Sequence, residues 1–242
     1  GLLMTQCPNA TLLVHPKGAP HLIDSTKLEG SAREVYGQAF ELLFAPIIDV
    51  PVERVHLIQD DEEIEIGGGE DGKSRVLSFY YAEGHSLSHF VIFDETTGSI
   101  ISGDALGMCY PTLKAHYNVD LVLPVSTPTQ FDPEAMMAFV SHAEKLEAKQ
   151  ICFAHFGVME DVPLVMKELK KWIQLFGTEA PKYYKKHRRF EALKDYMMEQ
   201  ILDELVIRGV PRDNEVINKL LFDIDLDAQG IIAYVKRGEK KK

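Results

Sequence analysis

The sequence predicts an α/β (α+β) fold in which a sheet-containing domain is followed by a helical subdomain. Short β-prone segments alternate with helical segments up to about residue 180. From residue 161 onward, nearly every segment has the apolar spacing of an amphipathic helix. No repeat or low-complexity linker divides the chain. We therefore expect one domain over residues 1–180 and a helical C-terminal subdomain over residues 181–242.

The composition excludes several protein classes. Of the 242 residues, 45% are hydrophobic and 26% are charged, as in globular proteins. No apolar run approaches the ~18 residues of a membrane span, and the first ten residues lack the pattern of a secretory signal. We therefore expect a cytoplasmic protein with no membrane partner.

The charge balance argues against a nucleic-acid partner. The net charge is −11, whereas affinity for nucleic acids depends on neutralising phosphates. The stretch KYYKKHRRF (182–190) is locally basic. In so acidic a chain, we interpret it as a solvated helix face rather than as a nucleic-acid site.

The first half of the chain predicts two strands, a helix and a set of hairpins. TLLVHP (11–16) and VERVHLIQ (52–59) have the composition of short strands. Between them, SAREVYGQAFELLF (31–44) has helical spacing, with Ser31 at the N-cap position and Glu34 three residues later, as in a capping box. Antiparallel hairpins are expected from four β-prone segments: EEIEI (62–66), RVLSFYY (75–81), HFVIFD (89–94) and GSIISGD (98–104).

The second half predicts one more strand among helices. DPEAMMAFVSHAEKLE (132–147) has Asp132 at the N-cap and Pro133 at the first helical position, which is a strong helix start. AKQICFAHFG (148–157) has the composition of a buried strand. We expect the helical region 181–242 to cover the mouth of a site or to form a homodimer contact.

The stretch GGGEDGKS (67–74) matches the phosphate-binding pattern G-x-x-x-x-G-K-[ST]. A phosphate loop connects a strand to a helix, yet the segment after Lys73 is the β-prone RVLSFYY. Seven carboxylates within residues 60–71 would also repel a triphosphate. We interpret the stretch as the turn of a β-hairpin with an acidic edge strand.

Three apolar segments end at residues of types that often bind metal ions. RVLSFYYAEGH ends at His85, GSIISGD at Asp104, and KQICFAHFG near His155. Each has a glycine nearby, which lets the chain turn sharply at the sheet edge. Two imidazoles and a carboxylate at one rim suit Zn²⁺ or a non-haem metal. Each residue also has a simpler explanation, because a histidine after a strand is often structural and Asp104 could cap the next segment.

Two longer runs resemble the metallo-β-lactamase superfamily. AEGHSLSHFVIFDETTGSIISGDALG (82–107) resembles its central segment, in which Gly-His, a hairpin and Ser/Thr-Gly-Asp supply two metal ligands. PVSTPTQFDPEAMMAF…ICFAHFG (124–157) resembles the next segment, whose last histidine is a ligand. The similarity is closest to the glyoxalase II-like, single-domain hydrolase branch and extends over about residues 1–180. It implies an αββα sandwich with a binuclear metal site.

The resemblance also implies a role for each residue of the set. His85 would bind the first metal and His155 the second, with Asp104 bridging them. The cofactor would be zinc, two ions in the intact family site, with iron or manganese as alternatives. A metal-bound hydroxide would attack an ester, thioester or lactone, so the expected partner is a small-molecule substrate. His89 would orient a ligand or touch the substrate, forming the predicted catalytic group with Asp104, unless it is a solvent-facing residue at a strand start.

The family's H-x-H-x-D-H motif has no counterpart in these 242 residues. We therefore expect an N-terminally incomplete domain in which His85, Asp104 and His155 are the remaining ligands. His116, in LKAHYN (113–118), is a further candidate for substrate contact. Two other functions stay open: a di-iron redox protein, and a non-catalytic or degenerate module of the same fold.

Overall fold

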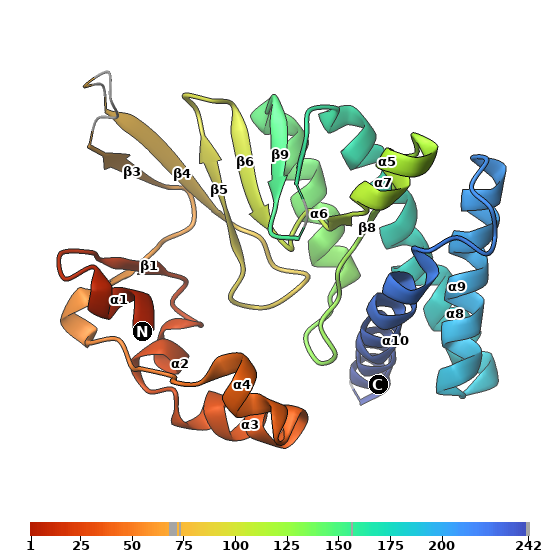
Figure 1. Cartoon of the computed structure of the whole chain (residues 1–242), viewed down its shortest axis with the longest axis horizontal. Helices are drawn as coiled ribbons and strands as arrows, with labels where there is room; N and C mark the ends of the chain where they lie inside the picture. Colours follow the sequence, from red (N-terminus) through yellow and green to blue (C-terminus); the bar gives the residue numbers. More distant parts are fainter. Residues whose placement is uncertain (68–71, 73, 156, 241–242) are drawn as a thin grey trace. The chain divides into compact units, whose positions relative to one another are not determined.

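The computed structural model describes residues 1–67, 72, 74–155 and 157–240. The chain divides into two compact units, Gly1–Glu62 and Glu63–Lys242. Figure 1 shows the elements of both units in chain order. Every candidate site residue predicted from the sequence lies in the second unit.

The first unit contains short helices and a two-stranded parallel sheet. β1 (Leu12–Val14) pairs with β2 (Val55–Leu57), so both predicted strands are confirmed over their central residues. The helical segments of this unit are α1 (Leu2–Gln6), α2 (Ala19–Ile23), α3 (Thr26–Tyr36), α4 (Ala39–Phe44) and η1 (Val52–Arg54).

The predicted capping box at Ser31 is wrong. Helix α3 begins at Thr26, and Ser31 lies inside it, where its hydroxyl donates to the Lys27 carbonyl oxygen at 3.1 Å. A serine within a helix can satisfy its hydroxyl in this way, so the residue type alone does not mark a helix start. The helix ends at Gly37, whose φ of +53° favours glycine. Residues 31–44 therefore belong to two helices rather than one.

The second unit contains a mixed sheet with the strand order β10-β9-β6-β5-β4-β3 over the part of the chain that the structure describes. The pairs β4–β5 and β5–β6 are antiparallel, which confirms the hairpins predicted from the last three of the four segments. β9 joins the sheet parallel to β6. The bounds are β3 (Glu62–Ile66), β4 (Arg75–Tyr81), β5 (Phe90–Asp94), β6 (Ser99–Gly103), β9 (Gln150–Phe153) and β10 (Val158–Met159).

The stretch GGGEDGKS lies between two strands. β3 precedes it and β4 follows it, and the two are neighbours in the sheet. A strand in place of the following helix excludes the geometry of a phosphate loop. Residues 68–71 and 73 lie outside the described residues, so the turn itself stays a prediction.

The remaining elements of the second unit are mostly helical. Asp132 accepts a hydrogen bond from the Ala135 amide at 3.0 Å, and Pro133 is the first residue of α6, which confirms the predicted helix start. No helix in the described ranges is both long and apolar enough to cross a membrane. The elements are β7 (Met108–Cys109), α5 (Pro111–Tyr117), β8 (Val122–Leu123), α6 (Pro133–Ala143), η2 (Glu144–Leu146), α7 (Val162–Gln174), η3 (Leu175–Glu179), α8 (Ala180–His187), α9 (Phe190–Ile207) and α10 (Ile217–Lys240).

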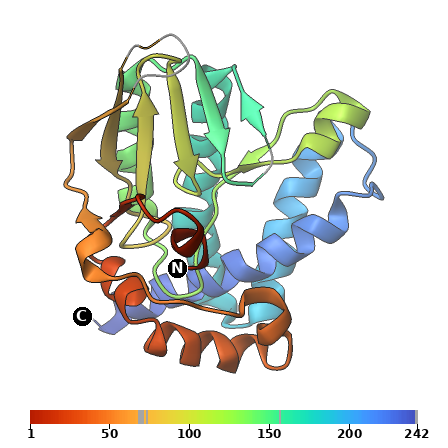
Figure 2. The same cartoon turned by 60° about the vertical axis from the view of Figure 1, so that its left-hand side comes forward.

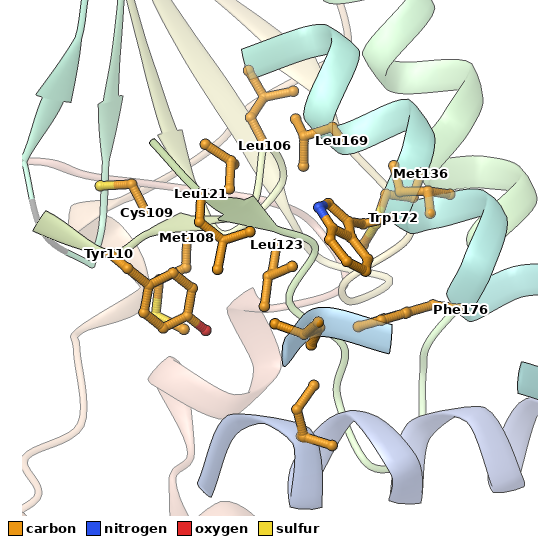
Figure 3. Packing of buried hydrophobic residues seen from close by; sticks show 14 of the residues in the cluster. Leu106, Met108, Cys109, Tyr110, Leu121, Leu123, Met136, Leu169, Trp172 and Phe176 are labelled. Atoms are coloured by element: carbon orange, nitrogen blue, oxygen red, sulfur yellow. The ribbon is translucent and has the colours of Figure 1, made fainter. Parts of the chain in front are cut away.

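One apolar cluster joins the sheet to the helices of this unit. It contains Ile100 and Ile151 from the sheet, Trp172 from α7, Phe176 from η3 and Ile224 from α10, all almost completely buried. Figure 3 shows Trp172 and Phe176 in this packing. The core of mixed helix and sheet confirms the predicted α/β class. The subdomain boundary at residue 180 stays a prediction, and the apolar cluster continues across it.

Candidate metal centre

The strand directions bring three chain segments to one edge of the sheet. β4 and β6 both run antiparallel to β5, and β9 runs parallel to β6. The carboxyl ends of β4, β6 and β9 therefore lie at the same edge. Asp104 directly follows β6, whereas His85 and His155 come shortly after β4 and β9.

The three predicted ligands meet at this edge. His85 Nε2 lies 3.4 Å from Asp104 Oδ2, and His155 Nε2 lies 3.4 Å from Asp104 Oδ1. The two imidazoles thus approach different oxygens of one carboxylate. The side chains of His85 and Asp104 are largely buried, whereas that of His155 is 54% exposed.

Glycines next to the ligands permit this arrangement. Gly103 has a φ of +52°, and a Cβ at this position would lie 2.6 Å from the His89 imidazole ring. Gly84 has a φ of +132°, and a Cβ there would lie 2.7 Å from the backbone of Met136. An L-residue at either position would displace the ligand that follows it.

The orientation of His85 is fixed by the loop that follows β8. His85 Nδ1 lies 2.9 Å from the Val125 carbonyl oxygen. A carbonyl oxygen can only accept, so Nδ1 carries a proton and Nε2, directed at Asp104, is the ring nitrogen left to bind a metal. The Thr127 hydroxyl donates to the His85 carbonyl oxygen at 2.7 Å. Backbone and side chain of His85 are therefore held by the same short segment.

His89 contacts the backbone of Asp104. The Asp104 amide donates to His89 Nε2 at 3.1 Å. The His89 ring also meets the His85 ring edge to face, with 5.6 Å between their centroids. The structure thus places His89 where it holds Asp104, and its predicted part in catalysis stays a prediction.

The donor set fits metal ions. Asp104 Oδ1 is buried and has no hydrogen-bond partner among the described residues. The 3.4 Å separations exceed an ordinary N–H···O hydrogen bond. Two ligands bound at tetrahedral angles to one zinc ion, each about 2.1 Å from it, are themselves about 3.4 Å apart.

The described residues supply part of each coordination shell. Searched over these ranges, the structure contains no group of three or more His, Cys, Asp and Glu side chains placed to hold one ion. Each histidine instead forms a two-ligand set with its own oxygen of Asp104. Imidazole nitrogen with carboxylate oxygen suits zinc, iron and manganese alike.

A cavity of about 710 Å³ adjoins His155. Its walls come from β7, the start of α5, the loop after β8 and one face of α10. Most of the lining side chains are apolar, which is typical of small-molecule sites. The lining includes Met108, Val125, Phe222 and Leu226, together with the polar side chains of Tyr110 and Asp223.

A tyrosine–carboxylate pair forms part of the cavity wall. The Tyr110 hydroxyl donates to Asp223 Oδ2 at 2.8 Å. Burial, together with the nearby Asp223 charge, raises the pKa of Tyr110 well above its usual value. Burial also raises the pKa of Asp223, although the Tyr110 hydrogen bond and the His155 charge oppose that shift. The sequence prediction missed this pair, because only folding brings α10 to the segment after β7.

The prediction for His116 assumed a loop beside the site. His116 instead lies on helix α5, where its Nδ1 pairs with a Glu215 carboxylate oxygen. It is not among the residues that line the cavity beside His155. Substrate contact by His116 therefore has no support from this arrangement and stays untested.

Comparison with known proteins gives a fold but no close relative. No protein-family model matches the chain, and no curated protein sequence matches it. Two solved structures are similar over nearly the whole chain. An archaeal metallo-β-lactamase superfamily protein from Sulfolobus tokodaii has 18% identity and a TM-score of 0.61, covering 96% of this chain and 73% of its own. A metallo-β-lactamase family protein from Thermus thermophilus has 16% identity and a TM-score of 0.51, covering 98% of this chain and 68% of its own.

A third similar structure has a stated activity. The stereoselective inverting sec-alkylsulfatase Pisa1 from Pseudomonas sp. has 10% identity and a TM-score of 0.55, covering 96% of this chain and 37% of its own. Identities this low establish a common fold rather than a common activity. The chain has the fold of the metallo-β-lactamase superfamily, as its sequence motifs predicted.

Proposed function

We propose that this protein is a metal-dependent hydrolase of an ester, thioester or lactone. One observation carries the proposal: His85 and His155 each direct Nε2 at a different oxygen of Asp104, at 3.4 Å. Such a carboxylate can serve two metal ions at once. The metallo-β-lactamase fold and the sec-alkylsulfatase of similar structure support hydrolytic chemistry at this edge of the sheet.

Some residues of the centre would bind metal ions, and others would orient these ligands. His85 and His155 would supply one imidazole nitrogen to each of two ions, and Asp104 one oxygen to each. When bound, zinc acts as a Lewis acid and lowers the pKa of a coordinated water to about 7. The Val125 carbonyl and His89 keep His85 and Asp104 in place, as hydrogen-bond partners of metal ligands do.

The cavity beside His155 is the proposed substrate site. Its apolar walls, which include Met108, Phe222 and Leu226, suit a hydrocarbon part of the substrate. Apolar surface removed from water stabilises the complex by about 25 cal/mol per Å². We therefore propose an acyl chain or other apolar group in this cavity, with its carbonyl carbon at the His155 end.

Metal analysis and hydrolysis assays test the proposal together. The purified protein should contain bound zinc, iron or manganese and should hydrolyse p-nitrophenyl octanoate or the matching thioester or lactone. Asp104→Asn keeps the size of the side chain but removes its charge, and should lower both metal content and rate by at least about 100-fold. His187→Ala, on the exposed end of α8, is the matched histidine control and should change neither.

Three outcomes would contradict the proposal. They are a protein that contains no metal above background, one that hydrolyses none of the three substrates, and an Asp104→Asn variant as active as the wild type. Bound iron with a visible absorption spectrum and no hydrolysis would favour the di-iron alternative. A protein with neither metal nor activity would be a non-catalytic module of the same fold.

A further inference from the structure

Helix α10 lies along the loop that orients His85. This loop, residues 124–132, connects β8 to α6, and Figure 1 and Figure 2 both show it beside α10. Polar contacts tie helix and loop together at several points. Arg237 of α10 donates to the carbonyl oxygens of Thr129 and Phe131, and Tyr234 donates to Glu134 at the start of α6 at 2.5 Å.

A buried carboxyl group of α10 contacts the loop residue that follows Val125. Asp227 is only 3% exposed. Its Oδ1 accepts the Ser126 amide proton at 2.8 Å, and the Ser126 hydroxyl donates to the Asp227 carbonyl oxygen at 3.3 Å. Ser126 is itself 3% exposed. Helix and loop are therefore joined by two hydrogen bonds that water does not reach.

The backbone of α10 also touches the loop directly. A Cβ at Gly230 would lie 2.5 Å from the Ser126 hydroxyl oxygen and 2.6 Å from the Thr127 carbonyl oxygen. Both distances are too short for any side chain. The glycine thus allows the helix to approach one turn after Asp227, and it leaves the loop no room to shift toward the helix.

Three consecutive loop residues link α10 to the metal centre. Val125 and Thr127 both contact His85, one through its imidazole Nδ1 and the other through its carbonyl oxygen. Ser126, between them, contacts Asp227. Because the Val125 carbonyl and the Ser126 amide belong to one planar peptide group, a displacement of the Ser126 amide also moves the Val125 carbonyl.

We propose that Asp227 is a positioning residue of the metal centre. By holding Ser126, it fixes the Val125 carbonyl that keeps His85 in its Nδ1–H form with Nε2 directed at Asp104. The purpose of this role rests on the proposed function, since a metal requires the unprotonated Nε2. The hydrogen bonds between Asp227 and Ser126 and the Nδ1–H form of the His85 ring do not depend on a bound metal.

The chemistry of the position favours this role over simple packing. Burying an ionisable carboxyl group is unfavourable, and an apolar residue would fill the same space at lower cost. Asp227 can be tolerated because the Ser126 amide donates to it. A side chain that accepts a hydrogen bond at a fixed point defines where a loop lies, which apolar contact does not.

The test compares variants of Asp227 with a control on the same helix. Asp227→Ala removes the oxygen that accepts a hydrogen bond from the Ser126 amide, whereas Asp227→Asn keeps an oxygen that can accept it. Gln229→Ala changes an exposed side chain of α10 and is the control. Gly230→Ala displaces the loop while the carboxylate stays, so it gives the same answer if Asp227→Ala fails to fold.

The first measurement needs no metal. Long-range ¹H–¹⁵N correlation spectra of the chelator-treated full chain report which ring nitrogen of His85 carries the proton. The wild type, Asp227→Asn and Gln229→Ala should show the Nδ1–H form, and Asp227→Ala and Gly230→Ala a mixture of both forms. A protein without metal or hydrolytic activity would refute the proposed function, and this measurement would still decide the role of Asp227.

The second measurement is zinc affinity by competition with a chelator. Loss of a residue that supports a ligand lowers metal affinity by about 10- to 100-fold, and we expect this for Asp227→Ala and Gly230→Ala. Asp227→Asn and Gln229→Ala should stay within about threefold of the wild type. A folded Asp227→Ala protein with an unchanged His85 ring and unchanged affinity would overturn the proposal.

Discussion

Replacing Asp227 by asparagine should change how the stability of the protein depends on pH. Burial raises the pKa of Asp227 to about 8, from an ordinary value of 3.8. Between these values, the folded protein holds a proton on Asp227 that the unfolded chain has released. The contribution of this group to stability is therefore complete below about pH 4 and is lost as the pH rises toward 8. Asparagine cannot titrate, so Asp227→Asn removes this dependence.

The size of the effect follows from the two pKa values. The free energy of unfolding should change by at most about 1.4 kcal/mol per pH unit. Between about pH 5 and about pH 8, the wild type should lose roughly 3 to 4 kcal/mol relative to Asp227→Asn. Such a loss is a large part of the roughly 5 to 15 kcal/mol that stabilises an ordinary domain.

Urea unfolding at several pH values measures the difference. The fluorescence of Trp172, the single tryptophan of the sequence, reports on the core of the second unit. Asp225→Asn is the matched control on the same helix. The Lys194 ammonium, which donates to Asp225 at 2.6 Å, lowers the pKa of that carboxyl. The contribution of Asp225 is therefore lost only below about pH 4, and the control should run parallel to the wild type from about pH 5 upward.

A constant difference between wild type and Asp227→Asn would refute the reasoning. If the two free energies differ by the same amount, within about 0.5 kcal/mol, across this range, Asp227 does not hold a proton in the folded state. A wild type that gains stability relative to the variant as the pH rises would mean that the carboxyl is stabilised in its charged form.

Three further substitutions test the site at other points. Tyr110→Phe leaves Asp223 without its hydroxyl donor and should lower the free energy of unfolding by about 1 to 3 kcal/mol, measured by urea unfolding at neutral pH; an unchanged value would mean that water replaces the hydroxyl. Gly103→Ala places a methyl group against His89 at a left-handed backbone position. It should lower the free energy of unfolding by about 2 kcal/mol or more and weaken zinc binding. A variant with the stability and the zinc affinity of the wild type would contradict the described contact. Phe222→Ser removes an apolar wall of the cavity and should raise KM for p-nitrophenyl octanoate about tenfold while changing that for the acetate less than about threefold; equal changes for both esters would place the acyl chain elsewhere.

Local chemistry in the sequence is enough to predict most elements of the sheet and several helix ends. The Asp132-Pro133 start of α6 and the turn residues between β5 and β6 are recognisable because each depends on neighbours in the chain. The prediction that β4, β6 and β9 end at one rim rests on the same kind of signal. The capping box at Ser31 failed because a serine can also bond within a helix.

The contacts that orient the site cannot be derived from local pattern. His85 depends on Val125, 40 residues later, and Ser126 depends on Asp227, 101 residues later again. One clue lies in LLFDIDLDA (220–228), where three aspartates stand among apolar residues. Two of them, Asp223 and Asp227, are four residues apart and so share one face of a helix. Acids on a face that is otherwise apolar indicate polar partners inside the protein rather than solvent.

The same face of α10 bears on the two roles predicted for the helical C-terminal region. Asp223 contacts Tyr110 in the cavity wall, Asp227 contacts Ser126, and Gly230 touches the loop backbone. These contacts occupy one face of the helix within the second unit, so that face has no surface left for a second subunit. A homodimer contact through α10 would use the opposite side, where Leu221 is exposed. The contacts of α10 therefore favour covering of the site, and a dimer that loosened α10 would also change the form of the His85 ring.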